Sequence, residues 1–302
     1  MHTPRVDRPV GILLALLGVL VLTPDTLLMR WVALDPWSLA AYRGWMMGTG
    51  MLLIYLFLNR GIRRKDLNAM GSWLGLSVIL VFGSNSLTFT LAVHETSVTL
   101  VLTAIATGPL MAAILSRLIL KERLTRATLL AILFSFIGVV LVVSGTHQSR
   151  GAPTGNPLLG AFFASLTALA WAYTLVIARL KSNLNLIPVA AVGGLISGSL
   201  CSLFSHDLGV APENRLWLLL MGFFVLPVSF SLLTLAPRYA PATAVGLILL
   251  LEAVLGPFWV WLGTGEKPGL QMIVGTFIVL LTLTFYILRQ SPSRPAHSSS
   301  SS

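Results

Sequence analysis

Charged residues are scarce in this chain of 302 residues: they make up 10% of it, whereas hydrophobic residues make up 56%. A water-soluble domain has about a quarter charged residues, so this composition excludes an ordinary soluble enzyme or binding module. Cysteine is also nearly missing, because Cys201 stands alone, which excludes an internal disulfide and a cysteine-rich metal site. The composition predicts an all-α integral membrane protein.

The motifs that carry chemistry are missing as well. The sequence has no glycine-rich phosphate loop with a lysine, no His/Glu metal-ligand spacing and no serine elbow. Connections between the apolar stretches are short, and the longest are residues 146–156 and 206–214. We therefore expect no catalytic residues, no metal, no cofactor, no ATP-driven chemistry and no nucleic-acid-binding domain in this chain.

What the chain does contain is apolar stretches long enough to cross a bilayer, which requires about 20 mainly apolar residues per helix. Ten stretches meet this requirement: 11–31, 37–58, 70–93, 97–120, 125–144, 157–180, 184–205, 215–236, 241–262 and 270–288. Five helices per half is an odd number, so the second half enters the membrane from the opposite side. The sequence thus predicts ten transmembrane helices arranged as two inverted five-helix repeats.

The predicted organisation is a cytoplasmic N-terminus, two repeats joined by a loop, and a polar C-terminal tail, with boundaries 1–10, 11–145, 146–156, 157–288 and 289–302. The basic residues support the orientation. With the N-terminus inside, fourteen lie in cytoplasmic segments: Arg5, Arg8, Arg60, Arg63, Arg64, Lys65, Lys121, Arg123, Arg126, Arg179, Lys181, Arg238, Arg289 and Arg294. Three lie outside: Arg150, Arg215 and Lys267. This asymmetry predicts a multi-pass inner-membrane protein with both termini cytoplasmic.

One segment occurs in both halves. Residues 95–124 form an apolar helix that is interrupted near its middle, and residues 239–268 repeat its pattern. Structural roles are expected for the prolines and glutamates of the two copies: Pro109, Glu122, Pro257 and Glu266. Both glutamates sit at helix ends near the membrane surface, where local arginines and backbone amides suffice to hold them.

These residues resemble a known family. The run from His94 to Gly145, with the Gly-Pro pair in one helix and Lys-Glu-Arg-Leu closing it, resembles the EamA domain of the drug/metabolite transporter superfamily. The second half repeats the domain, although Ala253 stands where many second repeats have proline. The resemblance implies a ten-helix bundle with a central cavity. Members of the family that resemble this chain include bacterial exporters of amino acids and related metabolites.

Ionisable residues inside the predicted helices are the main candidates for a site, because each costs about 2.5–3.5 kcal/mol or more at membrane depth. At about 1.5 Å per residue, Asp25 lies roughly 21 Å above the cytoplasmic start of its helix and Arg43 roughly 9 Å below the outer start of the next, so their depths coincide in a core of about 30 Å. We expect them to form an ion pair. Two interpretations stay open: exchange with a charged substrate, or a static bridge.

Glu252 lies roughly 16 Å into the ninth predicted helix, close to the midplane. Burial favours the neutral form of a carboxyl group, so Glu252 is a candidate to hold a proton in one state and a substrate amine in another. A hydrogen bond to a neighbouring helix, or an arginine partner, is the alternative.

Further substrate-binding candidates are polar or aromatic residues well inside the bilayer: Asn85, Thr103, Thr107, Trp171 and Tyr173. The threonines have a simpler interpretation, since hydroxyls in membrane helices often bond only their own backbone. The aromatic residues have one as well, namely packing. Pro24 removes a backbone donor and so predicts either a simple kink or a free carbonyl that lines the site.

The sequence therefore predicts a secondary transporter that moves a small amphipathic metabolite outward by alternating access, with an amino acid or a derivative as the substrate class. Its partners are this solute and the lipid bilayer, with proton coupling as an option; a monomer is the expected unit and a dimer stays open. The alternatives are an importer of a nucleoside- or S-adenosylmethionine-like metabolite and, in another class, a membrane-embedded scaffold or enzyme.

Overall fold

The computed structural model describes residues 8–32, 34–61, 63–96, 101, 104–122, 124–145, 156–181, 185–205, 207–264 and 270–290. Every regular element in these ranges is helical. The first half contains α1 (Arg8–Leu22), α2 (Asp25–Val32), α3 (Pro36–Asn59), α4 (Arg64–Gly71), α5 (Trp73–Glu95), α7 (Gly108–Leu115), the π-helical η1 (Ser116–Leu120) and α8 (Arg126–Gly145).

The second half contains more short elements. Its helices are α9 (Pro157–Leu180), α10 (Ile187–Ser202), η2 (Pro212–Asn214), α11 (Arg215–Leu219), the π-helical η3 (Leu220–Val225), α12 (Leu226–Leu235), η4 (Ala236–Arg238), α13 (Ala242–Thr264) and α14 (Leu270–Gln290). From η2 to η4 the helices follow one another directly, so together they form one long rod with changes of winding.

Length and composition mark this as a membrane protein. Five helical segments are long and apolar enough to cross a bilayer: Arg8–Met29, Trp73–Ala92, Leu158–Leu180, Pro212–Arg238 and Ala242–Gly263. Four shorter apolar helices accompany them: Gly108–Leu120, Arg126–Leu141, Ile187–Ser202 and Ile273–Arg289. Many large apolar side chains, such as Phe57 and Leu80, are exposed on the outside, where lipid would cover them.

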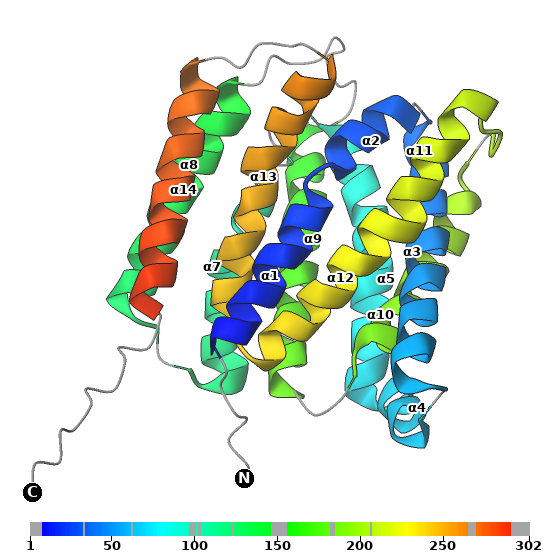
Figure 1. Ribbon diagram of the computed structural model, residues 1–302, viewed down its shortest axis with the longest axis horizontal. Helices are drawn as coiled ribbons and strands as arrows, with labels where there is room; N and C mark the ends of the chain where they lie inside the picture. The colour runs from blue at the N-terminus through cyan, green and yellow to red at the C-terminus, as the bar shows by residue number, and fades with distance from the viewer. Residues whose placement is uncertain are drawn as a thin grey trace, which may run out of the picture.

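The helices form one bundle whose closest pairs join the two halves of the chain (Figure 1). Helix α3 packs on α10, α5 on α9, α8 on α14, and α1 on both α12 and α13. In Figure 1 the start of α1 and the end of α14 both lie at the lower end of the bundle, together with α4. We call this the terminal end.

Small residues allow the closest of these approaches. A Cβ added at Gly44 would lie 2.5 Å from the backbone nitrogen of Gly198, and one at Gly48 would lie 2.6 Å from the carbonyl oxygen of Ala191. The small-residue spacing of α3 and α10 thus serves packing, as in other membrane helix pairs. Gly71 is different, because a Cβ there would meet open space. The spacing of Gly71 in the sequence therefore does not reflect close helix packing at this residue.

Helix α4 and the interrupted first helix are the main departures from the predicted elements. The sequence predicts one helix over 11–31, but the structure has α1 and α2 separated at Thr23 and Pro24. The segment that includes α4 was expected to be a plain connection. In the fourth predicted helix the described backbone turns at Ala106 and Thr107, and α7 begins at Gly108 with Pro109 in its first turn.

The break between α1 and α2 is stabilised locally. Pro24 has no N–H, so the carbonyl of Leu20, four residues earlier, loses its helical donor. The Thr23 hydroxyl donates to that carbonyl oxygen at 2.9 Å, and the Trp259 indole N–H of α13 donates to the Thr23 hydroxyl oxygen at 2.9 Å. The kink predicted at Pro24 is therefore present, whereas the expectation of a free carbonyl lining the site is wrong, because Thr23 satisfies it.

Candidate substrate site in the middle of the bundle

The ion pair between Asp25 and Arg43 is present. The Nη1 atom of Arg43 donates to Oδ1 of Asp25 at 2.7 Å and to Oδ2 at 2.8 Å. The Asp25 side chain is 4% exposed, and it stands in the first turn of α2, where the positive end of the helix dipole favours a carboxylate. Asp25 thus has two sources of stabilisation as an anion, and both come from the fold.

Arg43 uses only part of its hydrogen-bonding capacity in contacts with the described residues. Besides Asp25, its Nη1 atom contacts the Met221 sulfur at 3.6 Å, whereas Nε and Nη2 make no hydrogen bond with any described residue. A guanidinium group has five N–H donors. The Arg43 side chain is 22% exposed, so the described residues leave donor capacity of its guanidinium group unused.

Glu252 of α13 completes a group of three charged residues. It lies within electrostatic range of both Asp25 and Arg43, and it makes no hydrogen bond with the described residues. Helix α13 is packed by α1, α2, α7, α8, α9 and α14, and yet the Glu252 side chain is only half-buried. We call Asp25, Arg43 and Glu252 the mid-bundle site.

The π-helical turn η3 brings Met221 to this site. A π-helix adds a residue per turn and often occurs near functional sites. It also places Gly222 against α3, where an added Cβ would lie 2.3 Å from the Met46 sulfur. Met221 was missing from the predicted site residues, and no sequence signal marks this change of winding.

The side-chain oxygen of Asn85, on α5, is buried, and no described residue donates a hydrogen bond to it. The nearby hydroxyls are occupied: Ser84 bonds its own helix, and Thr88 bonds both its own helix and Thr167 of α9 at 2.9 Å. Among these neighbouring polar residues of α5, Asn85 therefore keeps an acceptor that the described residues leave unused.

The two predicted aromatic residues have neighbours of different kinds. Trp171 of α9 packs against Phe82 of α5 and Phe230 of α12, with ring centroids 6.0 Å and 5.1 Å away. The Tyr173 hydroxyl lies 2.7 Å from the Ser77 hydroxyl oxygen. Trp171 thus belongs to an aromatic cluster shared by three helices, while the polar end of Tyr173 is already bonded.

The remaining predicted residues contribute less. The Thr107 hydroxyl donates to the carbonyl of Ala104 at 2.6 Å, which is the simple backbone role expected of such threonines. Pro109 is buried against α13, and Pro257 lies within α13. Thr103 and Glu266 lie outside the described residues.

Glu122 has a different partner from the one expected. Its Oε1 atom pairs with Nε of Arg179 at 3.5 Å, and Arg179 belongs to α9 in the other half of the chain. The Arg179 Nη1 atom also donates to the carbonyl oxygens of Pro237 and Arg238, at 3.5 and 3.1 Å. The fold thus brings a distant helix end beside Glu122, whereas Arg123, the neighbouring arginine, lies outside the described residues, so the expected local contact stays a prediction. We call these contacts the Arg179 network.

The helical bundle with charged residues at its centre defines a membrane transporter, and comparison with known proteins gives the family. Residues 9–144 and 158–288 match the EamA-like transporter family. The chain belongs to this family.

Two curated relatives are named as transporters. The chain is 33% identical over 141 residues to the uncharacterized transporter YyaM of Bacillus subtilis (strain 168), a match over 45% of this chain and 46% of that protein. It is 24% identical over 245 residues to an uncharacterized transporter of Clostridium kluyveri, over 77% of this chain and 78% of that protein. The chain thus spans about half the length of the first of these relatives.

A solved crystal structure has the same fold. It superposes with a TM-score of 0.79, covers 92% of this chain and 98% of its own, and shares 16% sequence identity. At this identity the likeness concerns the fold alone.

Proposed function

We propose that the chain is a secondary transporter that moves a small zwitterionic metabolite, an amino acid or a derivative, across the inner membrane by alternating access between two inverted five-helix repeats. Glu252 carries this proposal, because it lies within electrostatic range of the Asp25–Arg43 pair and makes no hydrogen bond with the described residues. Export is the direction that the resemblance to bacterial exporters implies.

The helix contacts support the inverted repeat. If each helix of the first half is exchanged with its counterpart in the second, the α5–α9 contact becomes the α12–α1 contact, and α5–α10 becomes α12–α3. The α7–α9 contact likewise becomes α13–α1, while α3–α10 and α8–α14 map onto themselves. Such a pattern is expected of two halves related by a pseudo-two-fold axis, with the substrate site between them.

The charges of the mid-bundle site support a zwitterionic substrate. Arg43 and Asp25 neutralise each other, so an ionised Glu252 is left with a net negative charge inside the bundle. An unpaired charge at this depth is costly, so Glu252 should take up a cation, either a proton or a substrate ammonium. The unused Nε and Nη2 donors of Arg43 suit a carboxylate, which guanidinium groups bind through paired hydrogen bonds.

This arrangement also gives a physical reason for proton coupling. Because one carboxylate cannot hold a proton and an ammonium group at once, substrate binding at Glu252 would release the proton. A proton taken up from the other side would in turn expel the substrate. Asn85 adds a donor and an acceptor for a polar substrate group, and the Trp171 cluster offers an apolar wall.

The Arg179 network supports alternating access. It ties a helix end of the first half to the second half at the terminal end, where an opening to that side would have to separate them. The excess of basic residues at this end supports a cytoplasmic position for it. Contacts made by one arginine with an acid and two carbonyls are few enough to break in each cycle.

Counterflow in liposomes tests the proposal. Purified protein would be reconstituted with an internal pool of unlabelled amino acids, and uptake of labelled amino acids would be measured with and without a proton gradient. We expect saturable exchange that Glu252→Gln lowers by about tenfold or more. Exchange of a nucleoside but of no amino acid would favour the alternative importer. Chemical conversion of the labelled solute would favour an enzyme. The absence of flux with every solute tested would favour a scaffold.

A further inference from the structure

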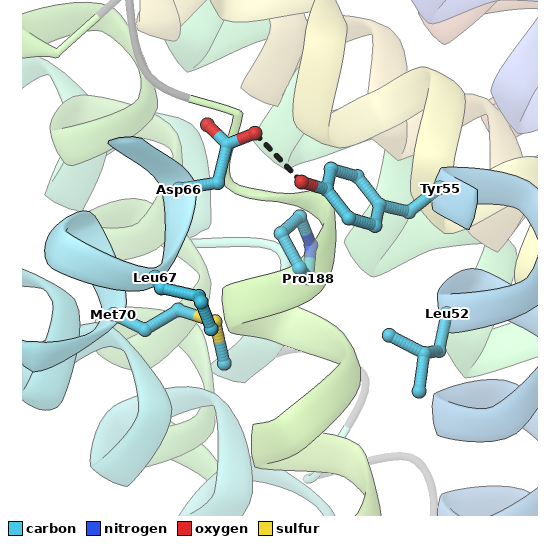
Figure 2. Close-up of a pocket in the computed structure, with 6 residues that line it drawn as sticks. All are labelled: Leu52, Tyr55, Asp66, Leu67, Met70 and Pro188. Carbon is cyan, nitrogen blue, oxygen red and sulfur yellow. Dashed lines mark hydrogen bonds between the residues drawn. The ribbon is translucent and has the colours of Figure 1, made fainter. Parts of the chain in front are cut away.

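A cavity lies apart from the mid-bundle site, in the corner between α3, α4 and α10 at the terminal end. It encloses about 60 Å³ and is lined by Leu52, Tyr55, Asp66, Leu67, Met70 and Pro188 (Figure 2). Leu67 is 49% exposed, so the cavity opens toward the surface beside α4. A transporter site between the two halves does not account for a cavity at this outer corner.

The polar groups of this corner are turned away from the cavity or engaged with each other. Oδ2 of Asp66 accepts a hydrogen bond from the Tyr55 hydroxyl at 2.7 Å, and the Tyr55 oxygen accepts one from the Arg63 backbone N–H at 3.2 Å. Figure 2 shows the other oxygen of Asp66 pointing away from Leu67 and Met70. The cavity wall is therefore apolar, and it suits a hydrocarbon chain better than a polar solute.

Four basic residues lie between the end of α3 and the first turn of α4, next in sequence to the residues that line the cavity. Arg60, Arg63, Arg64 and Lys65 are all exposed, whereas Asp66, the acid beside them, is 1% exposed. Arg60 is held in the left-handed region at φ 52°, where its backbone N–H caps α3 through the Leu56 carbonyl. The turn thus concentrates four basic side chains at one place on the surface, where they outnumber the one neighbouring acid.

The surroundings place this corner at the membrane–water interface. Phe57 is 86% exposed and Trp73 is 85% exposed, one at the end of α3 and one at the start of α5. Helix α4 lies between them, with exposed basic residues in its first turn and exposed Leu67 behind them. Exposed aromatic residues together with basic ones are typical of the level of lipid headgroups.

We propose that this corner binds an anionic phospholipid, whose phosphate contacts the Arg60–Lys65 cluster and whose acyl chain reaches into the cavity between α3, α4 and α10. Charge complementarity selects the headgroup, and the apolar wall accepts the chain. A free phosphate would satisfy only the basic cluster, and a neutral lipid only the cavity. The site is independent of the transported solute, so it does not depend on the proposed substrate class.

Thermal unfolding of delipidated protein in detergent tests this proposal, because a ligand that binds the folded state raises the apparent unfolding temperature. Phosphatidylglycerol, phosphatidylcholine with the same acyl chains, and inorganic phosphate would be added separately. We expect phosphatidylglycerol to give the largest shift. Equal shifts with both lipids, or a full shift with inorganic phosphate alone, would overturn the proposal.

Variants locate the effect. The double variant Arg63→Gln, Arg64→Gln removes the arginine before α4 and the first residue of α4. It should reduce the phosphatidylglycerol-induced shift in unfolding temperature by at least half. Leu67→Ser at the opening should reduce that shift by a smaller amount. Arg117→Gln with Arg126→Gln removes two exposed basic residues elsewhere at the terminal end and should leave the shift intact. If both double variants lose the same part of the shift, the lipid responds to overall charge and the proposed site is wrong.

Discussion

The mid-bundle site and the Arg179 network both join acids and arginines from different helices, but they differ in how fully the arginine is used. Arg179 contacts Glu122 and two backbone carbonyls through Nε and Nη1. Arg43 contacts Asp25 and Met221 through Nη1 alone, and Glu252 beside it has no hydrogen bond among the described residues. The difference supports the proposal that the mid-bundle site binds substrate while the Arg179 network holds the two halves together at the terminal end.

The largest effect is expected from Arg43→Gln. It leaves Asp25 buried without its partner, which should lower the free energy of unfolding by about 3–5 kcal/mol. Thermal unfolding in detergent would measure this loss, with Arg117→Gln, an exposed arginine on η1, as the control. Adding Asp25→Asn should restore most of the stability but none of the transport. Unfolding of Arg43→Gln at the wild-type temperature would contradict this account of the ion pair.

Glu252→Gln should separate function from stability. Because Glu252 makes no hydrogen bond, we expect little change in unfolding temperature, whereas counterflow should fall by about tenfold or more, equivalent to about 1.4 kcal/mol. The remaining transport should no longer vary between mildly acidic and mildly alkaline pH, since the group that exchanges the proton is gone. A full rate with an unchanged pH profile would remove Glu252 from the mechanism.

Thr23→Val tests the break in the first helix. The substitution keeps the shape but removes the hydroxyl that caps the Leu20 carbonyl and accepts from Trp259. We expect a loss of about 1 kcal/mol in unfolding free energy, the usual size of a hydrogen-bond contribution. Thr282→Val in α14, whose hydroxyl only bonds the Ile278 carbonyl, is the matched control and should change less. Equal losses in the two variants would mean that the contact with Trp259 contributes nothing.

Glu122→Gln should have the smallest effect. The Glu122 side chain is 33% exposed and its pair with Arg179 is 3.5 Å long, and such exposed pairs contribute about 0–1 kcal/mol. Counterflow and unfolding temperature should both stay near wild type. A loss of transport as large as that of Glu252→Gln would show that the terminal end is as important to the cycle as the mid-bundle site, and the contrast drawn above would fail.

Much of the fold was predictable because apolar length and proline are local signals. The helix over 157–180 was predicted with the bounds that the structure has, and the depth of Asp25 and Arg43 sufficed to pair them. Thr103 and Glu266 lie outside the described residues, so their roles stay predictions. Helix α4 was missed because its eight residues include only a few apolar ones, too few for a bilayer-spanning pattern.

The sequence by itself determined that this is a membrane protein, which residues carry charge into the bilayer, and where proline interrupts the first helix, since each follows from composition or from neighbours along the chain. Only the tertiary structure decided that Arg179 pairs with Glu122 and that the Trp259 indole donates a hydrogen bond to the Thr23 hydroxyl. It also decided that the side-chain oxygen of Asn85 has no partner among the described residues, and that Glu252 lies near the Asp25–Arg43 pair. These contacts join residues far apart in the chain, so helix packing fixes them.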